Sequence, residues 1–242
     1  MSECREPAVK RPPADRAGAW GLLARQAGGE LLGTGLLVAV VVGSGIAAQR
    51  LSPADTGLQL LENAIATALG LAVLVLVFQP LSGAHLNPVV TLADRVLYSK
   101  RSGGALALYL ASQLTGAAGG AVLANAMFGL PSRLSGRERA DPGPLLGELV
   151  ATAGLVLLVF ALARTGRGAL AGPAVGAYIG SAYWFTSSTS FANPAVTVGR
   201  VLTDSFAGIA PLSAGMFLLA QLAGGAIGAG LVALLFSRKA LP

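Results

Sequence analysis

The sequence predicts an all-α membrane protein with six transmembrane helices, two re-entrant half-helices and an inverted repeat. Three observations support this fold class. The chain of 242 residues is 54% hydrophobic and only 12% charged, with a mean hydropathy of +0.68, whereas soluble domains carry about 25% charged residues. Six apolar stretches are each long enough to approach a full bilayer crossing. Two short Asn-Pro runs interrupt the apolar pattern at matching places.

The six apolar stretches follow one another along nearly the whole chain. A helix needs about 20 apolar residues to cross the hydrocarbon core. The predicted bounds of the spans are 26–48, 58–81, 104–129, 145–163, 169–189 and 211–236. We therefore expect a single membrane domain over residues 21–237. Residues 1–20, which are rich in proline and charge, are predicted to form a disordered tail.

The two Asn-Pro runs lie between predicted spans. They are Asn87-Pro88-Val89, after the second span, and Asn193-Pro194-Ala195, after the fifth. Asn is a favoured helix N-cap and Pro is favoured at the first helical position. Neither run is long enough to cross alone, so each predicts a half-membrane helix that lines a cavity or is buried in protein. The positive helix N-termini would then meet near the bilayer centre.

The two halves of the chain repeat in the same order. Gly29-Glu30-Leu31 recurs as Gly147-Glu148-Leu149, and the segment that contains Gln113 recurs as the segment that contains Gln221. The repeats cover about 22–129 and about 145–237. Because each repeat holds three spans, an odd number, the second repeat enters the membrane upside down.

Two carboxylates lie inside predicted spans, where charge is costly unless it is paired. Glu30 and Glu148 could form a proton relay. Their repeated position instead favours a structural role, in which they accept hydrogen bonds from the backbones of the Asn-Pro loops. Gln113 and Gln221 are interpreted in the same way.

The Lys and Arg residues predict the orientation. An N-terminus inside the cell places twelve of them on the cytoplasmic side and five outside, which agrees with the positive-inside tendency. The outer five are Arg50, Arg133, Arg137, Arg139 and Arg200. We expect both termini in the cytoplasm of a bacterial inner membrane protein. The basic pI of about 10.1 is then explained by cytoplasmic loops, so no nucleic acid partner is expected.

These motifs resemble those of the aquaporin, or major intrinsic protein, family. The resemblance rests on Ser82-Gly83-Ala84-His85-Leu86-Asn87-Pro88, on Asn193-Pro194-Ala195, and on the paired Glu and Gln residues, and it covers about residues 22–237. It implies six spanning helices with two half-helices, a pore in each subunit and a homotetramer in the lipid bilayer. It also implies passive flow of water or small neutral solutes, without a cofactor.

Two departures from the family pattern bear on selectivity. Val89 stands where the family usually has Ala, and Val196 stands where its outer filter usually has Arg. Counting from the motifs places the filter at Thr67, Ser181, Ser190 and Val196. A ring that lacks the aromatic–arginine pair implies a wider and less polarised filter than that of a strict water channel.

Three further features follow from the resemblance or the motifs. Residues 187–197 and 203–209 resemble bacterial members associated with arsenic resistance, which implies neutral trivalent arsenic or antimony hydroxides, or methylated arsenicals, as substrates. Arg200, one turn after Val196, is interpreted as a partial replacement for the missing outer charge; a cap on an exposed helix end and a partner for Asp204 remain alternatives. His85, the single His, is expected to hold the inner loop or to line the inner mouth, and no metal is predicted because a metal site needs several ligands.

A passive channel is the leading functional hypothesis, with two alternatives. An ion-coupled secondary transporter also uses inverted repeats and broken helices, but it needs a charge at the break, and none flanks Asn87 or Asn193. A non-conducting membrane scaffold does not explain the paired Asn residues. No nucleophile–base set, metal cluster or phosphate loop in the sequence predicts an enzyme.

Overall fold

The computed structural model describes residues 16–99 and 101–236. These ranges form α1 (Arg16–Leu51), α2 (Thr56–Ser82), α3 (Pro88–Leu97), α4 (Gly103–Met127), α5 (Pro142–Arg164), the 3-10 turn η1 (Gly168–Leu170), α6 (Ala171–Phe185), α7 (Pro194–Arg200) and α8 (Pro211–Leu235). Most of the predicted tail lies outside the described residues. Helix α1 begins inside the last part of that predicted tail.

Five helices in the described ranges are long and apolar enough to cross a membrane: α1, α2, α4, α5 and α8. The helix observed in the predicted span 169–189 is shorter than the prediction. Helix α6 has 15 residues, and residues 186–189 belong to the next loop. The turn η1 leads directly into α6, and together they extend about 29 Å. This length is close to the hydrocarbon thickness of about 30 Å, so the pair serves as the sixth crossing.

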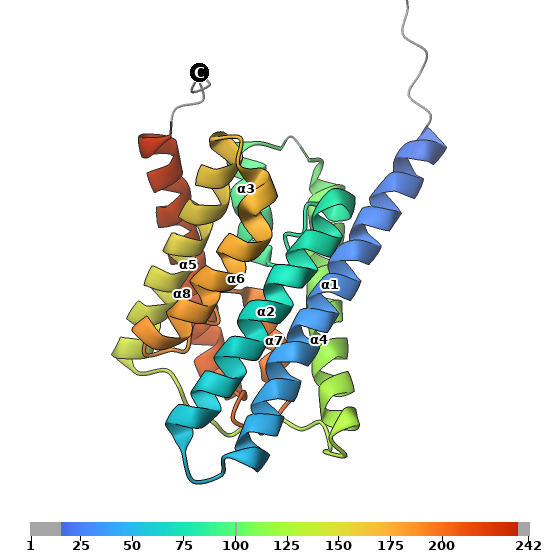
Figure 1. Cartoon of the computed structure of the whole chain (residues 1–242). Helices are drawn as coiled ribbons and strands as arrows, with labels where there is room; N and C mark the ends of the chain where they lie inside the picture. The colour runs from blue at the N-terminus through green and yellow to red at the C-terminus, as the bar shows by residue number, and fades with distance from the viewer. Residues whose placement is uncertain (1–15, 100, 237–242) are drawn as a thin grey trace, which may run out of the picture.

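The helices form two similar halves that pack as one bundle. Helix α1 packs on α2 and α4, and its counterpart α5 packs on α6 and α8, while α2 packs on α6 between the halves. Figure 1 shows the start of α1 and the end of α8 at the same end of the bundle. It also shows α3 towards that end and α7 towards the opposite end. This is the inverted repeat that the sequence predicts.

Glycines bring the longest helix pairs into backbone contact in both halves. A Cβ on Gly120 of α4 would lie 2.0 Å from the Gly35 carbonyl oxygen of α1. In the other half, a Cβ on Gly228 of α8 would lie 2.5 Å from the Ala153 carbonyl oxygen of α5. Small residues spaced by four allow such close helix packing in membranes. The absence of a side chain at these glycines therefore permits the close helix contacts of both halves.

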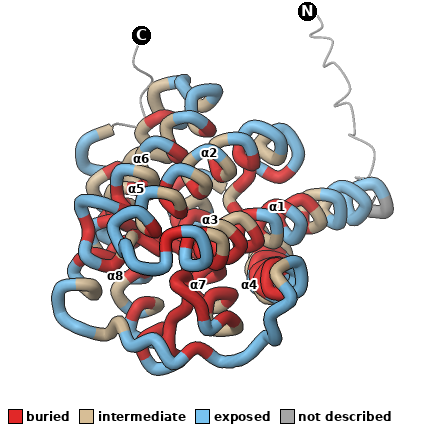
Figure 2. Tube along the Cα trace, turned by 60° about the horizontal axis from the view of Figure 1, so that its bottom comes forward, coloured by how far each residue is buried: buried red, intermediate tan, exposed pale blue. Residues whose placement is uncertain are grey.

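The outside of the bundle is apolar and the polar side chains gather within. Large apolar side chains on α2 are exposed, namely Leu58, Leu61, Ile65, Leu69, Val73, Leu76 and Val77. Figure 2 shows buried segments through α7 and beside α3, with exposed residues on the outer turns. Such an extended apolar surface suits a lipid environment, and it leaves the two half-helices in the protected centre.

Candidate functional site

Both half-helices begin with an asparagine cap, as the sequence predicts. The Asn87 Oδ1 accepts a hydrogen bond from the Val89 N–H at 2.9 Å. The Asn193 Oδ1 accepts from the N–H groups of Ala195 and Val196, at 2.9 and 3.3 Å. Each cap satisfies N–H groups that a helix start leaves unpaired. The caps also fix the direction of the remaining amide nitrogen.

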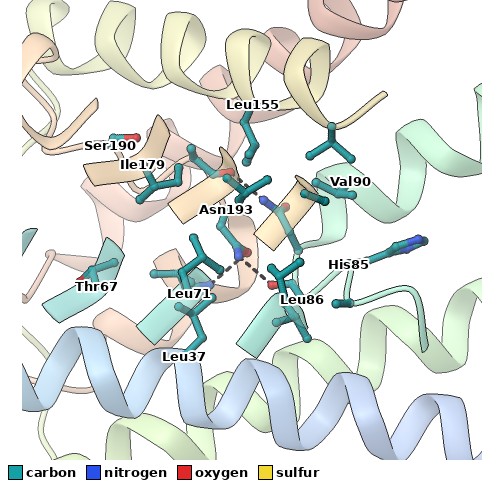
Figure 3. A pocket seen from close by; sticks show the side chains of 18 of the residues that line it. Leu37, Thr67, Leu71, His85, Leu86, Val90, Leu155, Ile179, Ser190 and Asn193 are labelled. Carbon is teal, nitrogen blue, oxygen red and sulfur yellow. Dashed lines mark hydrogen bonds between the residues drawn. The ribbon is translucent and has the colours of Figure 1, made fainter. Parts of the chain in front are cut away.

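The two asparagine side chains bind the opposite loops (Figure 3). The Asn87 Nδ2 donates to the Ala192 carbonyl at 2.8 Å, and the Asn193 Nδ2 donates to the Leu86 carbonyl at 2.7 Å. Each bond therefore joins one repeat to the other. These crossed bonds place the two half-helix N-termini next to each other in the buried centre.

The loops before the asparagines share an unusual backbone conformation. Ala84 and Leu86 have φ of 47°, and the corresponding Ser190 and Ala192 have φ of 46° and 47°. Residues with a side chain rarely occupy this left-handed region, which costs about 1–2 kcal/mol per residue. The alternation turns consecutive N–H groups to the same side, which makes a binding site for an anionic group.

Glu30 occupies the anion site of the first loop. Its carboxylate accepts from the N–H groups of His85 and Leu86 at 3.0 and 2.7 Å, and from the Gln113 Nε2 at 2.7 Å. The Ser82 hydroxyl donates to it at 2.6 Å. The side chain is wholly buried. Charge-assisted bonds to several donors stabilise a carboxylate that burial would otherwise disfavour.

Glu148 does the same for the second loop. It accepts from the N–H groups of Phe191 and Ala192 at 2.8 and 2.9 Å, and from the Gln221 Nε2 at 2.5 Å. Neither Glu30 nor Glu148 lines the cavity described next. The structure thus shows the loop contacts expected for the structural interpretation of Glu30 and Glu148.

A cavity of about 220 Å³ passes along both loops and both asparagines. Its wall is mostly apolar, formed by Leu71, Val75, Leu155, Val159, Val175 and Ile179. The polar groups of the wall are few and come from the loops, the half-helices and single positions on α2 and α6.

Three of the four predicted filter residues line this cavity, and one does not. Thr67, Ser190 and Val196 are in its wall. The placement of Ser181 is wrong: this side chain is exposed on the outside of α6, and its hydroxyl donates to the Tyr178 carbonyl at 2.8 Å. Counting back from Asn193 assumes a fixed loop length, and an error of two residues turns a helix position by about 200°.

Tyr183 takes the cavity-facing position that counting assigns to Ser181. Its side chain is buried in the cavity wall, with its hydroxyl 3.1 Å from the Thr67 hydroxyl on α2. Val175, Ile179 and Tyr183 are spaced by four and line the same wall. Residues four apart share a helix face. The spacing of these three residues in the sequence could therefore have predicted that Tyr183 faces the cavity.

Arg200 also lines the cavity, and it is only 1% exposed. Its guanidinium carbon lies 3.3 Å from the centre of the Phe191 ring, and its Nε donates to the Ala207 carbonyl. Asp204 pairs instead with Arg133 at 2.9 Å. Both alternatives for Arg200, a cap on an exposed helix end and a partner for Asp204, are therefore wrong.

A second arginine, in the loop between α4 and α5, lies near the Phe191 ring. Arg139 donates to the carbonyls of Gly208 and Phe206, both at 2.9 Å, and its guanidinium carbon lies 5.6 Å from the Phe191 ring centre. Burial, followed by the charge of Arg137, lowers the pKa of Arg139 to about 10. Arg139 therefore remains a cation at neutral pH.

His85 lies at the other end of the cavity and serves both expected purposes. Its ring is in the cavity wall, and its Nδ1 is 3.1 Å from the Thr91 hydroxyl of α3, which holds the inner loop. Asp94 lines the same end and pairs with Arg101 at 3.5 Å. Over the described ranges, no three His, Cys, Asp or Glu side chains gather as a metal site.

Val89, the departure in the first Asn-Pro run, is matched by a change on the facing helix. A Cβ on Gly225 of α8 would lie 2.2 Å from the Val89 Cγ1. In the other repeat, Ala195 and Ala117 occupy the corresponding places. A larger residue on the half-helix thus coincides with a smaller one on its neighbour, so the junction keeps its packing.

Residues 20–191 match the family model described as Major intrinsic protein. The chain belongs to this family. Similar proteins include Aquaglyceroporin AqpS of Rhizobium meliloti, 47% identical over 203 residues, which are 84% of this chain and 86% of the relative. The Glycerol uptake facilitator protein of Haemophilus influenzae is 34% identical over 176 residues, 63% of this chain and 65% of the relative.

A solved structure supports the same fold. The X-ray structure of the aquaglyceroporin from Plasmodium falciparum superposes with a TM-score of 0.68 at 18% identity, over 89% of this chain and 97% of that chain. The predicted family and the aquaporin-like fold are confirmed. The chain is a multi-pass membrane protein of a channel family.

Proposed function

We propose that the chain is a passive channel for small neutral solutes, including water and glycerol-type polyols, with a pore in each subunit. The carrying observation is the cavity with both asparagine amides in its wall, where half-helices from opposite ends meet. The names of the aquaglyceroporin and glycerol facilitator relatives support polyols as substrates.

The wall chemistry explains how a neutral solute would pass. An asparagine amide has two N–H groups, and each of Asn87 and Asn193 uses one of them to bind the opposite loop. The second N–H is left to donate to a passing oxygen. The loop N–H groups face the buried carboxylates, so loop carbonyls on the other side can accept hydrogen bonds. The apolar remainder keeps binding weak, and the positive helix N-termini disfavour cations.

The finer substrate proposal includes neutral trivalent arsenic or antimony hydroxides and methylated arsenicals. Thr67, Ser190 and Val196 are small side chains in the cavity wall. The Ser190 hydroxyl is buried and has no hydrogen-bond partner within the described residues, which leaves it available to a hydroxylated solute. Small neutral hydroxides present the same kind of oxygen donors and acceptors as a polyol.

The cellular setting is proposed from charge and shape. The sequence assigns twelve of the seventeen Lys and Arg residues to the cytoplasmic side, and the start of α1 and the end of α8 lie at the same end of the bundle (Figure 1). This supports cytoplasmic termini in a bacterial inner membrane. The exposed apolar faces support contact with lipid. Membership of the family supports a homotetramer of single-domain subunits, each covering residues 21–237.

Stopped-flow permeability of proteoliposomes to water, glycerol and arsenous acid tests this function. Val196→Arg should lower glycerol and arsenous acid permeability relative to water, because a long cation would fill the outer end. Val196→Leu controls for added size without charge. An unchanged solute-to-water ratio in Val196→Arg contradicts the filter assignment. Wild-type liposomes without flux contradict a channel, and saturable, gradient-driven uptake favours a coupled transporter.

A further inference from the structure

The outer end of the cavity carries an aromatic side chain and an arginine that the motif-based filter positions do not include. Tyr183 reaches it from α6 and Arg200 from the end of α7. The positions given by counting are instead occupied by Ser181, which faces outward, and Val196, which is apolar. The aromatic ring and the charge at this end therefore come from Tyr183, two residues after Ser181, and from Arg200, four residues after Val196.

The positive charge of Arg200 is held in place without an acidic partner. Within the described residues, 16–99 and 101–236, the ion pairs are Arg101–Asp94 and Arg133–Asp204, and neither includes Arg200. The Phe191 ring face and the Ala207 carbonyl fix the guanidinium, and Tyr183 interacts with it as well. An arginine stays charged in such surroundings, and a buried charge acts strongly on a nearby ion.

Hydroxyl groups supply the other polar part of the cavity wall at this end. Tyr183 is hydrogen-bonded to Thr67 on the neighbouring helix, which bridges α2 and α6 across the wall. The Ser190 hydroxyl is unpaired within the described residues. Val196 and Ile179 supply the apolar part of the same wall. A neutral solute can exchange hydrogen bonds here, whereas a cation meets a fixed like charge.

We propose that Tyr183 and Arg200 form the outer selectivity clamp of this channel, admitting neutral hydroxylated solutes and excluding cations. This inference rests on the proposed channel function. It replaces the expectation of a less polarised filter, because the charge missing at position 196 is supplied one helical turn later. Arg200 acts by charge, and Tyr183 acts by its hydroxyl and by its bond to Thr67.

The first test removes the charge in full-length protein reconstituted into liposomes. Arg200→Gln should keep glycerol flux, measured by light scattering, and raise potassium and proton leak by about tenfold or more, because the barrier of a nearby like charge is lost. Arg200→Lys keeps the charge and should keep ions out. If Arg200→Gln excludes ions as well as wild type does, the clamp is wrong.

The second test uses a matched pair on α6 and does not depend on the fate of the arginine variants. Tyr183→Phe removes a hydroxyl that can exchange hydrogen bonds with a hydroxylated solute, together with its bond to Thr67, so the glycerol-to-water permeability ratio should fall by about threefold or more. Ser181→Ala removes an exposed hydroxyl and should leave the ratio unchanged. Equal ratios in the two variants overturn the clamp.

The two proposals fail in different ways. Wild-type protein that passes neither water nor glycerol rejects the channel itself. Wild-type protein that conducts, together with unaltered selectivity in Arg200→Gln and Tyr183→Phe, rejects only the clamp.

Discussion

Glu30 and Glu148 show how single residues make the irregular loops possible inside a membrane. Each loop carries left-handed residues and N–H groups that no helix satisfies. A carboxylate from a spanning helix accepts those N–H groups, and a glutamine from another helix binds the carboxylate. Without this acceptor, the loop backbone would hold unpaired polar groups in an apolar setting.

Replacing Glu30 should therefore destabilise the protein. Glu30→Ala leaves the N–H groups of His85 and Leu86 without their acceptor, at about 1–3 kcal/mol for each buried unpaired group. Thermal unfolding in detergent measures the effect. Glu62→Ala is the control, because Glu62 accepts one side-chain bond from Ser52. A similar loss of thermal stability in the two variants would contradict the structural role of Glu30.

At the scale of elements, the bundle depends on how closely paired helices approach. The pairs α1–α4 and α5–α8 touch backbone to backbone at glycines, and α6 approaches α2 in the same way at Gly172 and Gly176. This closeness positions the half-helices, because α3 and α7 are wedged against α8 and α4. Changes in helix separation should reach the pore through these contacts.

Two adjacent glycines of α4 allow a sharp comparison. Gly120→Ala places a methyl 2.0 Å from a carbonyl oxygen of α1, whereas Gly119→Ala meets no atom within 4 Å. Gly120→Ala should cost about 1–3 kcal/mol through overpacking, and Gly119→Ala should be neutral or slightly stabilising, because Ala favours helix more than Gly. Thermal unfolding of both variants checks this; equal stability would refute the close α1–α4 contact.

The junction of Val89 with α8 predicts a compensating pair. Gly225→Ala alone should destabilise by about 1–3 kcal/mol, since the new methyl would meet Val89. Combining it with Val89→Ala recreates the arrangement of the other repeat and should recover most of the loss. A double-mutant cycle of unfolding free energies measures the coupling. Strictly additive effects would show that the two sites do not interact.

At the scale of the molecule, the inverted repeat assigns each loop to one side of the membrane. The loop before α4 lies with the start of α1, and the loop between α4 and α5 lies at the opposite end (Figure 1). The excess of basic residues places the first side in the cytoplasm. The two sides can be told apart with single cysteines, because the chain has one Cys.

Labelling in intact spheroplasts tests this orientation. In a Cys4→Ser background, Gly136→Cys should react with a membrane-impermeant maleimide, and Gly103→Cys should react only after permeabilisation. Both positions are exposed, and an added Cβ meets no atom within 4 Å at either. The reverse pattern would place the termini outside the cell.

Much of this architecture could be predicted from the sequence, because local signals and the repeat agree. The caps at Asn87 and Asn193 follow from the preference of Asn-Pro for helix starts. The burial of Glu30 and Glu148 follows from the cost of charge in lipid. The glycine contacts follow from the spacing of small residues.

The cavity wall could be predicted only in part, because it depends on loop length and on distant contacts. The loop from α6 to Asn193 shifts the helix phase, so Tyr183 rather than Ser181 faces the cavity. The burial of Arg200 depends on Phe191 and Ala207, which meet it through tertiary packing. No spacing rule on one helix contains that information.

The crossed bonds of the two asparagines also constrain the order of folding during synthesis on the ribosome. Asn87 is translated 105 residues before the Ala192 carbonyl that its amide requires. During that interval the Asn87 amide lacks the carbonyl acceptor that it has in the folded protein. If the first half has already entered the bilayer, we expect the insertion machinery or water to provide a hydrogen-bond acceptor for this amide. The nascent chain can complete its conduit only after residue 192 has left the ribosomal tunnel.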